Sequence, residues 1–119
     1  MSRLWISLGA LAGLLAVVVA ATATHALADE RAREIVRSGV QMQGWHALAL
    51  LGTGLWAPRG GLMANLAGAA FMLGMLTFCS AVYALGFGGL HTGLLAPLGG
   101  LLLMLGWVLL GLSAIFQRT

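Results

Sequence analysis

The feature that most constrains this chain is its set of long apolar stretches without a single charge. Residues 4–24, 62–87 and 94–116 contain no Asp, Glu, Lys or Arg. About 20 helical residues cross the hydrocarbon core of a bilayer. Lipid offers no partners for backbone polar groups, so apolar spans must be helices or a closed barrel. Because the runs are continuous rather than alternating, they exclude barrel strands and predict membrane-spanning helices.

The composition also indicates that lipid surrounds most of the chain. Of the 119 residues 61% are hydrophobic and only 8% are charged, whereas charge makes up about a quarter of an ordinary soluble domain. The lipid bilayer is therefore the expected partner of most of the surface. The formal net charge of +3 forms no basic stripe, and we expect no binding to nucleic acid.

A fourth span is predicted between the first two of these runs. The apolar stretch over residues 45–56 is too short alone, but extension back to residue 38 gives a full span that includes Gln43 and His46. We therefore expect an all-α fold, an antiparallel four-helix transmembrane bundle in a single domain over residues 1–119. Its helices are predicted at about 4–25, 38–57, 62–87 and 94–116, with a tight turn over residues 58–61.

The charged residues lie in the connections. All three acids and three of the arginines fall within residues 26–37, which predicts a short interfacial segment between the first two helices. With four crossings, Arg3, Arg59 and Arg118 share one side, and Arg31, Arg33 and Arg37 lie on the other. The count of basic residues ties, and only the signal-like first helix favours cytoplasmic termini. Residues 1–28 also resemble a secretory signal, but their apolar run is longer than a typical h-region, so we expect no cleavage.

Small residues at heptad spacing predict where the helices touch. Helices already in lipid gain little from apolar contact, so close approach through small side chains decides their packing. Two stripes predict a left-handed antiparallel contact between the last two helices, and a GxxxG pair predicts a packing face on the first. The predicted packing residues are Ala67, Gly74 and Ala81, then Gly99, Gly106 and Ser113, and finally Gly9 and Gly13.

A few polar side chains inside the spans are the candidates for a site. Depth along the helices brings several of them to one half of the membrane, where they can face a common polar vestibule. The ligand-binding candidates are His25, Gln43, His46, Ser80 and Tyr83, with Gln41 and His91 nearby.

An ionisable residue within a span is a functional candidate by default. For His46 a structural interpretation stays open beside the functional ones, namely a neutral ring hydrogen-bonded to Ser80, Tyr83 or a backbone carbonyl. The functional alternatives are ligand binding or proton handling, and a metal or haem ligand, for which only three histidines are available. No Ser-His-Asp set, phosphate loop or paired carboxylates occur. We expect no enzyme, no cofactor and no metal.

Four segments carry a resemblance that covers nearly the whole chain. They are residues 24–27 (THAL), 43–51 (QGWHALALL), 78–83 (FCSAVY) and 96–100 (APLGG). In that order and spacing they resemble the YgdD-like family of small inner-membrane proteins, a domain of unknown function 423, to which human transmembrane protein 256 is related. The resemblance implies a four-helix protein of the bacterial inner membrane and implies no reaction.

Two function hypotheses follow. The first is a non-enzymatic accessory or assembly partner of a larger membrane complex, in contact with other membrane proteins or with further copies of itself. The second is a small ligand-binding or transport protein with a polar intramembrane site around His46. A dry, tightly packed surrounding of His46 would weigh against the second hypothesis.

Overall fold

Three long helices make up the part of the chain that the structure, a computed structural model, describes, which is residues 1–117. They are α1 (Ser2–Ala26), α2 (Glu30–Gly88) and α3 (Leu95–Ile115). Each is long and apolar enough to cross a membrane. A straight helix of 59 residues would be about 88 Å long at 1.5 Å per residue, yet the longest extent of the molecule is 53 Å. Helix α2 must therefore fold back on itself.

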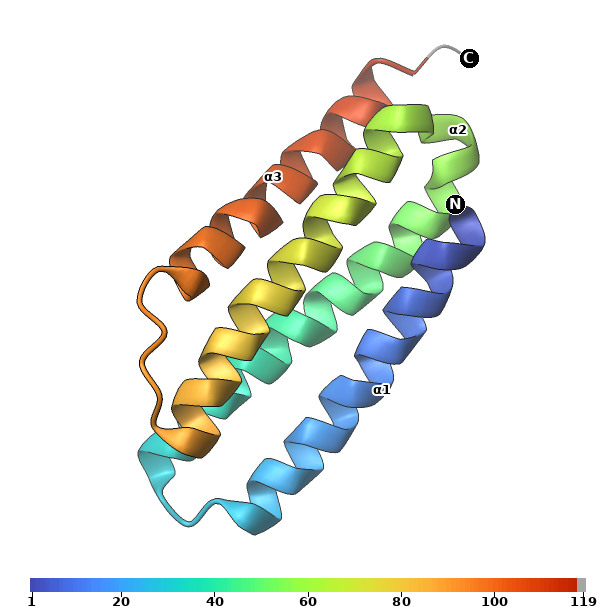
Figure 1. Ribbon diagram of the computed structural model, residues 1–119. Coiled ribbons are helices and arrows are strands. Elements are labelled where there is room, and N and C mark those ends of the chain that lie inside the picture. Colours follow the sequence, from blue (N-terminus) through green and yellow to red (C-terminus); the bar gives the residue numbers. More distant parts are fainter. Residues whose placement is uncertain (118–119) are drawn as a thin grey trace.

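The reversal occurs at one residue. Gly61 has φ 63° and ψ −146°, a conformation that side-chain-bearing residues rarely adopt. It divides α2 into a first arm (residues 30–60) and a second arm (residues 62–88), which lie side by side and run in opposite directions (Figure 1). The prediction of four separate helices was therefore wrong in its count, because a single glycine reverses the chain without an intervening loop.

The helical path through Pro58 has a specific support. Proline has no backbone N–H, so the carbonyl four residues earlier loses its helical donor. That carbonyl belongs to Gly54, and the Ser2 hydroxyl of α1 donates to it at 2.5 Å. Pro58 can therefore stay inside the helix, and the predicted tight turn over residues 58–61 is confined to Gly61.

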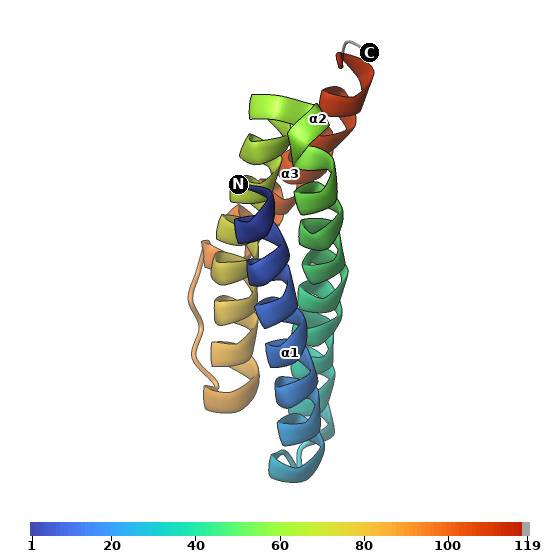
Figure 2. The same cartoon turned by 90° about the vertical axis from the view of Figure 1, so that its right-hand side faces the viewer.

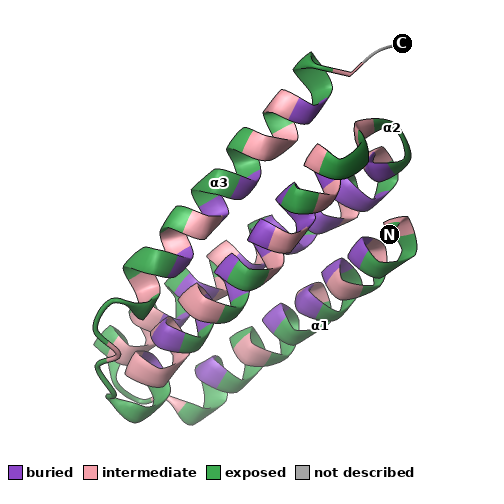
Figure 3. Cartoon of the chain, turned by 45° about the horizontal axis from the view of Figure 1, so that its top comes forward, coloured by how far each residue is buried: buried purple, intermediate pink, exposed green. Residues whose placement is uncertain are grey.

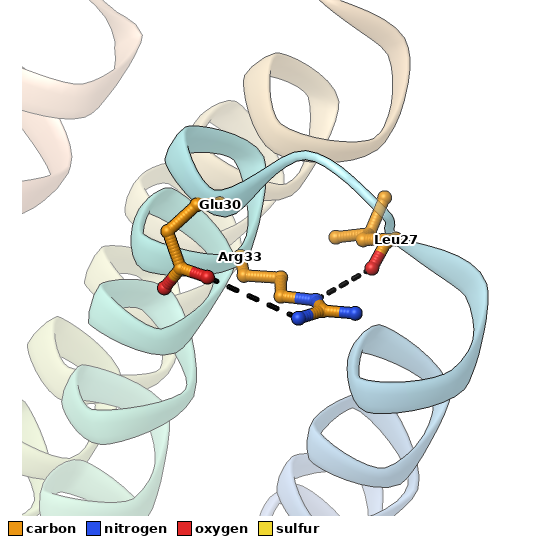
Figure 4. A network of polar contacts seen from close by, with 3 residues as sticks. All are labelled: Leu27, Glu30 and Arg33. Carbon is orange, nitrogen blue, oxygen red and sulfur yellow. Dashed lines mark hydrogen bonds and ion pairs between the residues drawn. The ribbon is translucent and has the colours of Figure 1, made fainter.

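The predicted start of the second helix at residue 38 was also wrong, because the charged residues expected in a separate segment before it belong to α2. The helix begins at Glu30, so only residues 27–29 connect it to α1. Figure 4 shows the contacts that hold this start: Arg33 Nε donates to the Leu27 carbonyl at 2.5 Å, and Arg33 Nη1 lies 3.9 Å from Glu30 Oε2. Glu30, Arg31, Glu34 and Arg37 are exposed, while their backbone is helical from the first turn.

The helices pack in three layers. Helix α1 and helix α3 both contact α2 and not each other, and Figure 2 shows α1 on one side of the two arms and α3 on the other. Buried positions gather on the faces turned toward α2, with exposed positions on the outside (Figure 3). The largest fully buried side chains are Phe71, Leu50, Leu103, Val36 and Thr53.

The N-terminus lies near the reversal within α2. Together with the end of α3 they form one end of the bundle, and both connections lie toward the other (Figure 1). The second connection begins at Gly89, whose φ of 66° ends α2: the Gly89 N–H donates to the Leu85 carbonyl at 2.9 Å, and the Leu90 N–H donates to the Ala84 carbonyl at 3.1 Å. Pro97 lies in the first turn of α3, where its missing N–H costs no helical hydrogen bond. Arg118, counted in the predicted topology, is outside the described residues.

Candidate functional site

The contact between the second arm of α2 and α3 is built on small residues. A Cβ at Gly74 would lie 2.9 Å from the Leu103 nitrogen, one at Gly99 would lie 2.5 Å from the Phe78 nitrogen, and one at Gly106 would lie 2.6 Å from Phe71. The remaining positions of the two heptad stripes, Ala67, Ala81 and Ser113, are buried. The two helices therefore approach backbone to backbone and hold the aromatic side chains between them in fixed positions.

Helix α1 approaches the first arm in the same way. A Cβ at Gly9 would lie 2.9 Å from the Ala47 carbonyl oxygen, and one at Gly13 would lie 4.0 Å from the Ala47 Cβ. On the other side of α1, Trp5 is 4% exposed, and its ring nitrogen donates to Asn65 Oδ1 at 2.8 Å. Helix α1 therefore touches both arms, which fixes the backbone around Gln43 and His46.

His46 lies near the middle of the first arm of α2 and is closed off by protein. It is 9 residues from Arg37 and 13 from Arg59, or about 14 Å and 20 Å along the first arm. Only 3% of its surface is exposed. Its ring is 5.7 Å from both the Phe71 and the Trp107 rings, which themselves are 5.1 Å apart. We call these three side chains the His46 cluster.

Both ring nitrogens of His46 have partners within the chain. Trp107 Nε1 donates to His46 Nε2 at 3.0 Å. An indole nitrogen only donates, so Nε2 is the acceptor and the proton of a neutral ring is on Nδ1. That nitrogen lies 2.6 Å from the Met42 carbonyl oxygen, which accepts. The neutral ring thus satisfies both partners, and no ring nitrogen is left to bind a ligand or metal.

Gln43, one helical turn before His46, belongs to a different contact. Its side-chain nitrogen donates to the Ala12 carbonyl of α1 at 2.8 Å. The Tyr83 hydroxyl, from the second arm, donates to Gln43 Oε1 at 2.7 Å. A Cβ at Gly39 would lie 2.6 Å from the Tyr83 ring, so glycine makes room for this tyrosine. Gln43 thereby links α1 and both arms of α2.

A groove of about 210 Å³ opens beside the Gln43–Tyr83 pair. It runs between α1 and the second arm of α2, and we call it the α1 groove. Gln43, Ser80 and Tyr83 are its polar lining residues. The apolar ones include Leu8, Leu11, Leu15, Met72, Met75 and Leu76. The groove can take an apolar body with one polar end.

The predicted site residues therefore do not form one vestibule. Gln43, Ser80 and Tyr83 line the same groove, whereas His46 does not line it and contacts α3. His25 is exposed in the last turn of α1. Gln41 is exposed, and His91 lies exposed in the connection before α3. Ligand binding by the predicted set stays a prediction, and three of its five members share a surface.

Two residues of the His46 cluster were not predicted. Phe71 and Trp107 are apolar-looking positions inside long apolar runs, and nothing in their spacing singles them out. Trp107 is half exposed, so one face of its ring seals His46 while the other faces outward. A buried histidine in a span needs hydrogen-bond partners. The indole N–H of Trp107 on a neighbouring span can supply one, and this was the only signal in the sequence that could have linked the two residues.

Known proteins similar to this chain are membrane proteins of unknown function. Residues 19–100 match the family described as "Protein of unknown function (DUF423)". A "UPF0382 membrane protein" of Haemophilus influenzae is 31% identical, with 100% of this chain and 99% of the relative covered. A "UPF0382 membrane protein" of Staphylococcus haemolyticus is 30% identical, with 93% and 94% covered. No solved structure matches the chain.

Proposed function

The chain belongs to the DUF423 family of membrane proteins, and from this premise we propose that it is a non-enzymatic accessory or assembly partner of a larger membrane complex. In this proposal each arm of α2 crosses the bilayer separately, so the chain spans the bacterial inner membrane four times. The connections are three residues between α1 and α2 and six between α2 and α3. The longest extent of 53 Å is little more than the roughly 40–45 Å of a bilayer with its headgroups. The chain's contacts are therefore made within the membrane.

One observation carries the proposal, which is the outward face of the first arm. Gly44 and Gly52 have open space where a Cβ would be, and between them Leu48 is 68% exposed. At the interior glycines another part of the chain approaches closely, but nothing approaches Gly44 or Gly52. Glycine in a helix interior costs about 1 kcal/mol relative to alanine, and outward small residues are typical of helix docking in membranes. This face fits a helix of a partner or of a second copy.

The interior polar groups support a structural rather than a chemical role. Gln43, His46, Thr53 and Ser113 are the buried polar residues of the described chain, and each has a hydrogen-bond partner inside it. The Trp56 ring nitrogen donates to the Ser113 hydroxyl at 2.9 Å, which ties α3 to the first arm. Gln43, His46 and Ser113 thus bond between helices or arms, whereas Thr53 bonds back to the Ala49 carbonyl within its own helix.

The test replaces the outward glycines in pairs. The Gly44→Leu, Gly52→Leu double variant fills the docking face of the first arm. Its matched control is Val17→Leu, Val108→Leu, which places two leucines at outward positions that hold no glycine and lie 69% and 56% exposed on α1 and α3. Extraction into native nanodiscs and mass measurement should give an assembly larger than the 12.3 kDa chain for wild type and the control. The first variant should give the monomer with an unchanged melting temperature. Monomeric wild type would refute the proposal.

Ligand binding is the second candidate, and the α1 groove favours it. With His46 occupied by Trp107 and Met42, the ligand would lie instead against Gln43, Ser80 and Tyr83. Ser80→Leu fills the groove from its exposed wall, and Leu73→Ser, exposed on the same arm, is the control. Native mass spectrometry with palmitate as the probe should show retention by wild type and the control, and loss in Ser80→Leu. Equal retention by all three would exclude the groove.

The side on which the termini lie is the remaining part of the proposal. Four crossings put the N-terminus and the Gly61 reversal on one side, and we assign that side to the cytoplasm. The support is the signal-like character of α1, since four crossings leave three arginines on each side and the count of basic residues ties.

A further inference from the structure

A second cavity lies at the other end of α1, and nothing in the proposed function uses it. Its volume is about 210 Å³, and it is formed between the last turns of α1 and the first turns of α2. We call it the interfacial cavity. Its lining residues are Ala20, Ala23, Thr24, Arg33, Val36, Arg37 and Val40. Two arginines and a threonine thus share a small cavity with aliphatic residues.

The guanidinium of Arg33 is held in place before any ligand arrives. Its Nε donates to the Leu27 carbonyl at 2.5 Å, and its Nη1 lies 3.9 Å from Glu30. In Figure 4 the other terminal nitrogen is turned away from Glu30, on the side of α1. Arginine donates through five N–H groups in a fixed fork, so this anchoring leaves donors free on the side that lines the cavity.

Arg37 lies one helical turn after Arg33, and both line the cavity. Among residues 1–117, the ion pair of Arg33 with Glu30 is the only one found. Asp29, Glu30 and Glu34 are exposed and do not line the cavity. Arg33, Arg37 and Glu30 together carry a net charge of +1. A monoanion such as a phosphodiester would balance this charge.

The polarity of the cavity changes along the membrane normal. Thr24, Arg33 and Arg37 lie where the apolar run of α1 ends and the charges of α2 begin. Ala20 and Val40 lie about one turn, or roughly 5 Å, deeper in the membrane. Basic groups at headgroup level above an aliphatic floor match a phospholipid, with its phosphate outermost and its glycerol and acyl chains beneath. A free phosphate ion would gain nothing from contact with these aliphatic side chains.

We infer that the interfacial cavity binds the phosphate of an anionic bilayer phospholipid, with Arg33 and Arg37 as its ligands. Arginine suits a phosphate because its planar fork can donate two parallel hydrogen bonds. An anionic lipid such as phosphatidylglycerol is preferred to phosphatidylcholine, because the ammonium of the latter would add a third positive charge beside the two arginines. The site is distinct from the α1 groove and from the outward face of the first arm.

Native mass spectrometry of the full chain from nanodiscs of equimolar phosphatidylglycerol and phosphatidylcholine tests the site. Wild type should retain phosphatidylglycerol preferentially. Arg33→Gln and Arg37→Gln should each weaken retention about five-fold, the effect of one basic residue at a membrane surface. Arg37→Lys should retain most of it. Arg31→Gln, which removes an exposed charge at the same end outside the cavity, is the matched control, and melting temperatures report folding.

The outcomes separate a site from general attraction, and a lipid from a free anion. Loss in Arg33→Gln and Arg37→Gln, with retention in Arg31→Gln and unchanged melting, supports the inference. Equal loss in all three variants, or no loss in any, overturns it. Glycerol phosphate added at the concentration of the lipid should not displace it. Displacement would mean that the acyl chains contribute nothing, and it would contradict a lipid site.

Discussion

Two buried polar side chains of the first arm of α2, His46 and Gln43, lie one helical turn apart and satisfy their hydrogen bonds in different surroundings. His46 is closed between Phe71 and Trp107, with both nitrogens hydrogen-bonded inside the chain. Gln43 is also bonded, to Ala12 and Tyr83, but its contact forms one wall of the α1 groove. Partners thus decide whether a polar residue in a span is sealed or borders an open surface.

The largest effect should come from emptying the His46 cluster. Phe71 is fully buried, and Phe71→Ala leaves a cavity where His46 and Trp107 now pack. Such changes cost about 3–5 kcal/mol in soluble cores, and we expect about 3 kcal/mol here because transfer from lipid contributes little. Steric trapping in bicelles measures it. Leu73→Ala, 56% exposed on the same arm, should cost almost nothing, and an equal loss would show that the cluster is not a centre of packing.

A smaller effect is expected for the bond between His46 and Trp107. Trp107→Phe keeps an aromatic ring and removes the indole N–H, so His46 Nε2 loses its donor. A double-mutant cycle of Trp107→Phe with His46→Leu should give a coupling of about 1 kcal/mol, within the range of about 0.6–1.7 for hydrogen bonds between membrane helices. Trp45→Phe, on an exposed ring, is the control. A coupling near zero would show that the hydrogen bond between His46 and Trp107 does not stabilise the fold.

The hydrogen bond between Tyr83 and Gln43 should contribute less to stability than the one between Trp107 and His46. Tyr83→Phe removes the hydroxyl that donates to Gln43, and we expect a loss of about 0.6 kcal/mol in the same unfolding measurement. The groove admits other molecules to this polar group, which can replace part of the lost bond. A loss larger than that of Trp107→Phe would reverse the comparison between the two sides.

The smallest effect should be that of Ser80→Ala. Ser80 is exposed in the wall of the α1 groove, so we expect a change within about 0.5 kcal/mol, as for surface positions. Circular dichroism during heating measures it beside Tyr83→Phe. A loss above 1 kcal/mol would mean that Ser80 holds helices together and does not simply line the groove.

Much of the fold was predictable because lipid leaves few alternatives. Three uncharged runs longer than the membrane requires predict spans without reference to packing, and α1 and α3 end within two residues of the predicted limits. The position of the reversal was predicted less accurately. Pro58, Gly60 and Gly61 together indicate a turn over several residues, whereas the helix is interrupted at Gly61 alone. Only the contact from Ser2 to the Gly54 carbonyl, which is far away in the sequence, explains why the helix continues through Pro58.

The candidate site was less predictable, since depth along a helix does not determine which way a residue faces. Gln43, Ser80 and Tyr83 were placed together by depth and do line one groove. His46 has a similar depth but points to α3, where Trp107 donates to it. Helix rotation depends on contacts between spans, and those contacts involve Phe71 and Trp107, which no periodicity distinguishes from other apolar residues.

The most direct test of the central claim, that α2 folds back at Gly61 and crosses the membrane twice, is the labelling of single cysteines. In a Cys79→Ala background, Arg3→Cys, Arg59→Cys, Arg31→Cys and His91→Cys are exposed to a membrane-impermeant thiol reagent in right-side-out and inverted vesicles. We expect positions 3 and 59 to react from one side and positions 31 and 91 from the other. Labelling of positions 3 and 59 from opposite sides would contradict the claim.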